Sequence, residues 1–283
     1  MKQLQMLQRA GFDPHAMASF FQRLQQATRV YENNAPSYLR THPLTVERIS
    51  DMQNRTLGLP VTPSSDSPEF LLIQAKIRAL RGVPSEAVND IQLALREQKL
   101  PVNLGNYALA IAYLRGRDFA NAEKAVAAAR QAKLASPLLD RVSAEIALTK
   151  GDIDLGLSRY REALNRYPHT LSLLRPYVEA LQRHKRAQDG LNALDAEKKF
   201  NTTEDLALLR LRAQLLADLG KRASSHRMQG EVYAQQQQLA AAIEQFEFAQ
   251  RAADSDFYEM SIIDARLREL RRQLTEEMRS RDK

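Results

Sequence analysis

The segment 144–168, AEIALTKGDIDLGLSRYREALNRYP, sets out the repeating unit of this chain. Two stretches rich in helix-forming residues flank Gly151, and glycine is the usual residue just past a helix end. Pro168 closes the second stretch. Small and aromatic side chains recur at helical spacing where two antiparallel helices would touch: Ala144, Ala147, Gly156, Tyr160 and Ala163. The segment therefore predicts a hairpin of two helices.

Similar marks return about every 34 residues, in the segments 75–101, 110–129 and 230–249. This period resembles that of tetratricopeptide (TPR) repeats, whose stacked hairpins form a concave groove that can hold another polypeptide. We expect an all-α fold with a TPR superhelical array from about residue 69, in which 222–236 is the second helix of one unit and the first of the next. A capping helix at 256–281 should end the array, because it has one apolar stripe and one charged face.

Composition narrows the class of protein. The 283 residues include no cysteine, which excludes disulfides and any thiolate zinc site. No apolar run approaches the roughly 20 residues that span a bilayer, and the first nine residues lack the apolar core of a signal peptide. The net charge of +7 concentrates in 175–186 and 210–227. Stacking aromatics do not accompany those cations, so we expect no nucleic-acid partner.

The first 55 residues follow a different pattern. Three short helices are expected there, the second opened by Asp13 and Pro14. They are too few to bury a core alone, so residues 1–55 are interpreted as the incomplete end of another domain. The segment 56–68, TLGLPVTPSSDSP, predicts a linker, and the array with its cap occupies 69–283.

Two short motifs in this first part carry a family resemblance. The segment 7–14, LQRAGFDP, resembles the stretch just after the zinc site of BepA-type periplasmic metalloproteases. The segment 41–45, THPLT, with 47–49, ERI, resembles a loop farther along the same proteins. The resemblance implies a HExxH metallopeptidase domain followed by TPR repeats, in a periplasmic protease and chaperone for outer-membrane protein assembly. Its partners would be polypeptide clients or proteins of the assembly machinery. A free-standing TPR scaffold or adaptor, unrelated to proteolysis, is the alternative.

The chain departs from that family at the catalytic centre. HExxH places two histidines one helical turn apart with a glutamate between them. No pair has this spacing among the five histidines, His15, His42, His169, His184 and His226. We therefore expect no catalytic residue, metal ligand or cofactor in this chain, and zinc only in a complete parent protein, of which this chain would be the downstream part. The resemblance implies that His42 would lie near that zinc; by itself it is a loop residue before Pro43.

The predicted groove contains one more group of candidate binding residues. Aligning the repeats puts Tyr107, Arg141, Arg175 and Arg210 at one position of successive first helices, with spacings of 34, 34 and 35 residues. Arg183 belongs to the same basic centre. Such a ladder can bind carboxylates or backbone carbonyls of an extended partner. Alternatively, Glu145 and Glu179, four residues after an arginine each, form ordinary ion pairs on the helix surface. The oligomeric state is left open by the sequence.

Overall fold

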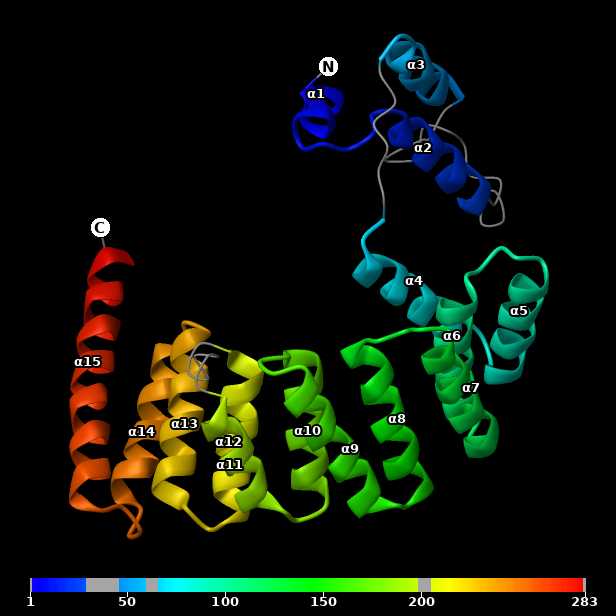
Figure 1. The fold of residues 1–283 in the computed structure, drawn as a ribbon. Coiled ribbons are helices and arrows are strands. Elements are labelled where there is room, and N and C mark those ends of the chain that lie inside the picture. Colours follow the sequence, from blue (N-terminus) through cyan, green and yellow to red (C-terminus); the bar gives the residue numbers. More distant parts are fainter. Residues whose placement is uncertain (1, 29–45, 60–65, 198–204, 282–283) are drawn as a thin grey trace. The chain divides into compact units, whose positions relative to one another are not determined.

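The computed structural model describes residues 2–28, 46–59, 66–197 and 205–281. Over these residues the chain forms fifteen α-helices and no strand, which confirms the predicted all-α class (Figure 1). It divides into two compact units, Met1–Leu71 and Leu72–Lys283. None of the described helices is long and apolar enough to cross a membrane.

The first unit contains α1 (Lys2–Arg9), α2 (His15–Thr28) and α3 (Val46–Thr56). Gly11 has a φ of +79°, a left-handed conformation that glycine adopts without strain, and this turns the chain after α1. The carboxylate of Asp13 then accepts a hydrogen bond of 3.1 Å from the N–H of His15 at the start of α2. Buried apolar side chains are small in number among the described residues of this unit: Leu4, Ala18 and Ile49. His42 lies outside the described residues.

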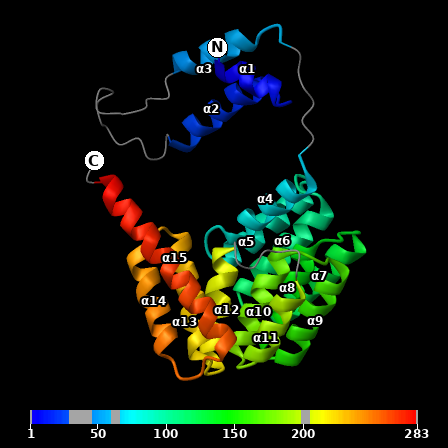
Figure 2. The same ribbon diagram turned by 90° about the vertical axis from the view of Figure 1, so that its left-hand side faces the viewer.

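From α5 onward, the second unit is a row of antiparallel helices that pack in chain order (Figures 1 and 2). Its helices are α4 (Pro68–Leu80, which begins in the first unit), α5 (Pro84–Arg96), α6 (Val102–Arg115), α7 (Phe119–Gln131), α8 (Pro137–Lys150), α9 (Ile153–Arg166), α10 (Leu171–Arg183), α11 (Ala187–Ala196), α12 (Leu206–Asp218), α13 (Arg222–Gln235), α14 (Leu239–Arg251) and α15 (Phe257–Arg281). The hairpins predicted at 110–129, 144–168 and 230–249 form from α6 and α7, α8 and α9, and α13 and α14. The hairpin predicted at 75–101 differs, because over the described residues α4 makes no comparable contact with α5. The arrangement is TPR-like.

Glycine serves two different purposes in these hairpins. Gly151 ends α8 with a φ of +106°, and nothing would lie within 4 Å of a Cβ there, so its role is backbone conformation. Gly156 lies where α9 crosses α8, and a Cβ would come within 2.5 Å of the Leu148 side chain. Gly230 is equally close to Phe246 across α13 and α14. The small residues of the repeat thus permit close helix packing.

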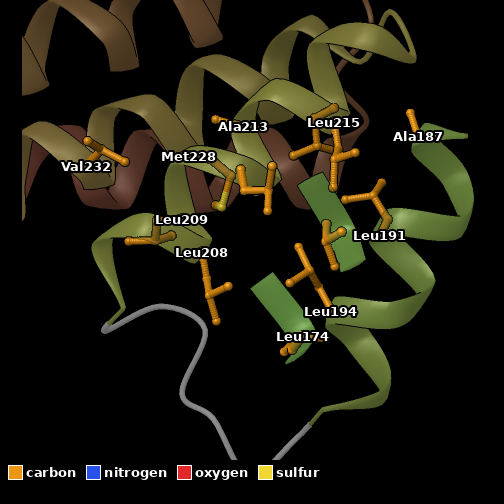
Figure 3. Packing of buried hydrophobic residues seen from close by; sticks show 13 residues of the cluster. Leu174, Ala187, Leu191, Leu194, Leu208, Leu209, Ala213, Leu215, Met228 and Val232 are labelled. Atoms are coloured by element: carbon orange, nitrogen blue, oxygen red, sulfur yellow. The ribbon is translucent and has the colours of Figure 1, made fainter. Parts of the chain in front are cut away.

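Helix α13 contributes to two hydrophobic cores, as the repeat pattern predicts for 222–236. Met228 and Val232 pack with leucines of α10, α11 and α12 (Figure 3). Ala223 and Ala234 pack instead with residues of α14 and α15. One helix therefore completes the hairpin before it and begins the hairpin after it.

Helix α15 closes the array. Its predicted stripe is buried at Ile263, Leu267 and Leu270, whereas Met278, farther along the helix, is 59% exposed. The guanidinium of Arg266 forms hydrogen bonds of 2.9 to 3.2 Å to both carboxylate oxygens of Glu231 in α13. The cap is thus held by an apolar stripe and a charged pair together.

Candidate functional site

The first helices of four successive hairpins, α6, α8, α10 and α12, lie next to one another. Two depressions open between them, each of about 440 Å³. One, which we call the α10 pocket, is lined by Arg141, Leu171, Ser172, Arg175, Pro176, Glu179, Asp205 and Leu208. The other is lined by Leu114, Glu145, Leu148, Thr149, Arg183 and His184. We call these four helix surfaces, with both depressions, the groove wall.

Arg141 is bound to a carboxylate of its own helix. Its Nε donates to Glu145 Oε1 over 2.7 Å, and both side chains are 32% exposed. Burial by itself would lower the pKa of Arg141, but the charge of Glu145 and its hydrogen bond outweigh burial and raise the pKa. The guanidinium therefore stays protonated, and the carboxylate of Glu145 largely balances its positive charge.

Tyr107 lies beneath the groove wall. Its side chain is 1% exposed, and burial, opposed by the charge of Arg141 and reinforced by that of Glu145, raises its pKa to about 12. Tyr160 of α9 is also buried and has a raised pKa for the same leading reason. The charges of Arg141 and Glu145 thus act on two buried phenols, and Tyr107 offers almost no exposed surface for a partner.

The other three predicted groove residues differ in their partners. Arg175 Nε donates to Glu179 Oε1 over 2.9 Å, and Arg183 Nε donates to the Glu179 carbonyl over 3.3 Å. Arg210, exposed on α12, has no carboxylate within ion-pair distance in the described part of the chain. The structure brings Arg141 and Arg175 into the α10 pocket and Arg183 into the second depression, while Tyr107 and Arg210 line neither.

Two features of this region did not emerge from the sequence. Asp140 on α8 has a side chain only 9% exposed and accepts from Arg130 of α7 over 2.9 Å and from Arg166 of α9 over 2.6 Å. We call these three residues the α7–α9 cluster. Pro176 lies inside α10, in the α10 pocket. A proline within an otherwise helical pattern was the available signal for the second feature.

Within the described residues, no group of three or more histidine and carboxylate side chains is placed to hold a metal ion. The sequence, moreover, lacks the paired histidines of HExxH. This chain's own residues do not fit a zinc centre of that type, and no catalytic step is assigned to them.

Comparison with known proteins yields relatives but no matching family model. The "Beta-barrel assembly-enhancing protease" of Escherichia coli K12 is 28% identical over 283 residues, covering 95% of this chain and 55% of the relative. The protein of the same name from Yersinia pestis is 31% identical over 170 residues, 59% of this chain and 33% of the relative. A putative protease of this kind from Vibrio cholerae is 35% identical over 121 residues. The BepA-type resemblance is thus confirmed, and the chain spans about half the length of the first of these relatives.

Proposed function

We propose, from its similarity to beta-barrel assembly-enhancing proteases, that this chain is the protein-binding region of a BepA-like periplasmic protease and chaperone. The groove wall would hold an extended or partly folded polypeptide, either an outer-membrane protein client or a protein of the assembly machinery. The observation that carries the proposal is the pair of depressions of about 440 Å³ on adjacent first helices. Stacked helical repeats use such continuous surfaces to bind other chains.

Proteolysis, in this proposal, belongs to a zinc-binding part that this chain does not supply. The purified chain should hold no stoichiometric zinc and cleave no unfolded protein, because it lacks HExxH and every thiolate ligand. Metal analysis combined with a casein digestion assay tests both expectations. One tightly bound zinc per chain that is lost in His42→Ala would contradict this division of labour.

Site-directed photocrosslinking tests the binding face. A photoreactive residue is placed at Thr149, Ser172 or Arg210 on the first helices, and at Arg161 or Asn192 on the second helices as matched controls. Incubation with a denatured outer-membrane protein should give crosslinks from the first set and not from the second. Crosslinks confined to the second helices, or to residues 1–55, would show that the groove wall is not the binding face.

A free-standing scaffold, unrelated to proteolysis, is the second candidate. Both candidates predict the same fold for this chain, and they differ in what the DNA upstream of it encodes. An in-frame HExxH in the DNA upstream of the Met1 codon supports the protease. Its absence, together with binding of assembly proteins by the chain alone, supports the scaffold.

A further inference from the structure

Pro176 is the sixth residue of α10, well inside the helix. Proline has no backbone N–H, so the carbonyl one turn earlier receives no i+4 hydrogen bond from it. That carbonyl belongs to Ser172. Ser172 and Pro176 both line the α10 pocket, so the residue whose carbonyl lacks this bond borders the groove wall.

Hydrogen-bond donors stand at the same pocket. Arg141 and Arg175 each use Nε for a glutamate of their own helix, Glu145 and Glu179. A guanidinium has five N–H donors in a rigid fork, so the remaining donors of both arginines can serve a ligand. The residues that carry these donors and the acceptor therefore line one cavity of about 440 Å³.

The pocket is balanced in charge. Two arginines and two carboxylates line it, and one of the carboxylates, Asp205, accepts from the N–H groups of Ala207 and Leu208 at the start of α12. A carboxylate ligand would meet these acids as well as the arginines. Leu171 and Leu208 add apolar surface at its wall. The lining suits a neutral group with both a donor and an acceptor, beside an apolar side chain.

We infer that the α10 pocket binds the main chain of an extended polypeptide through the Ser172 carbonyl freed by Pro176, a site that deepens and rests on the proposed groove function. An amide N–H of the bound segment donates to that carbonyl, and a neighbouring carbonyl accepts from Arg141 or Arg175. An apolar side chain of the segment packs on Leu171 and Leu208. Every polypeptide carries these amides, so recognition tolerates many sequences and depends little on the partner's charge.

Pro176→Ala tests this inference in the full chain. Alanine restores the N–H that satisfies the Ser172 carbonyl and also favours the helix. Binding of a fluorescein-labelled neutral twelve-residue peptide of serine, threonine and asparagine with two central leucines should weaken about fivefold or more, while the melting temperature stays equal or rises. Pro137→Ala is the matched control, because the first residue of α8 donates no helical hydrogen bond.

A chemical change in the peptide gives an independent measurement. N-methylation of its central amides removes the donors and should weaken binding to the wild-type chain, but should have little further effect on Pro176→Ala. Raising the salt concentration tenfold should change the affinity less than twofold. Unchanged binding by Pro176→Ala, indifference to N-methylation, or a strong preference for acidic peptides would each overturn the inference while leaving groove binding intact. If the wild-type chain binds no peptide at all, the proposed function itself fails, and the inference with it.

Discussion

The groove wall and the α7–α9 cluster use arginine in two different ways. On the groove wall, Arg141 and Arg175 pair with glutamates four residues along the same helix. In the α7–α9 cluster, Arg130 and Arg166 reach from two helices to one carboxylate of a third, Asp140. A pair within one exposed helix contributes a few tenths of a kcal/mol, whereas a pair that shares a buried carboxylate holds hairpins together. The groove arginines can therefore exchange partners with little effect on the fold.

Removal of the shared carboxylate should have the largest effect on stability. Asp140→Ala removes the carboxylate that both guanidiniums share. Because Arg130 and Arg166 are 50% and 59% exposed, water screens part of the loss, and we expect the free energy of unfolding to fall by about 2 kcal/mol. Urea unfolding followed by circular dichroism measures the change. Asp154→Ala is the control, since that side chain is 98% exposed in its pair with Arg186 and should change stability by less than about 0.5 kcal/mol. Equal losses in both variants would erase the contrast between the two regions.

The buried phenol under the groove wall predicts an alkaline effect. The pKa of Tyr107 is raised to about 12 in the folded chain, above its ordinary value of 10.0. Its contribution to stability is therefore complete below pH 10 and lost as the pH rises toward 12, by about 2 kcal/mol at the upper end. Tyr107→Phe should lose less stability over this interval than the wild type. Parallel pH profiles of the two proteins would contradict burial of this hydroxyl.

The cap extends the comparison to another pair between helices. Arg266 of α15 binds Glu231 of α13 through two nitrogens, with side chains 28% and 26% exposed. Arg266→Ala should lower the free energy of unfolding by about 1 kcal/mol, more than an exposed pair and less than the α7–α9 cluster. Arg175→Ala, in which an exposed pair within α10 is lost, is the matched control. A smaller loss of stability in Arg266→Ala than in that control would show that the Arg266–Glu231 pair contributes no more than the exposed pairs of the groove wall.

The smallest effect on stability is expected when the two glutamates that pair with the groove arginines are neutralised. The double variant Glu145→Gln, Glu179→Gln should change the free energy of unfolding by less than about 0.5 kcal/mol. It should nevertheless bind acidic peptides more tightly than the wild type, in a salt-dependent way, because Arg141 and Arg175 lose their own counter-charges. Fluorescence anisotropy with an acidic and a neutral peptide measures this gain. No gain would mean that the glutamates do not control the charge of the groove.

Local patterns in the sequence predict much of this fold. The hairpin around Gly151, the double role of α13 and the two glutamate pairs all follow from spacings within one or two helices. Side chains that meet between helices at irregular separations carry no such signal. Asp140 of α8, for example, joins partners 10 and 26 residues away, in α7 and α9. The period placed Tyr107 in the ladder without indicating that it is buried. The place of Pro176 in a pocket on the groove wall depends on the packing of α8, α10 and α12, which no local pattern encodes.

The two cores that meet at α13 have a consequence for how the array opens. Met228 and Val232 belong to the core on one side of this helix, and Ala223 and Ala234 to the core on the other. Hydrogen exchange should therefore find α10 to α15 opening as one cooperative unit rather than fraying hairpin by hairpin from the end. Opening of the cap would then also open the helices that carry the α10 pocket. Occupation of the binding face should therefore slow hydrogen exchange in α15, at the end of the array.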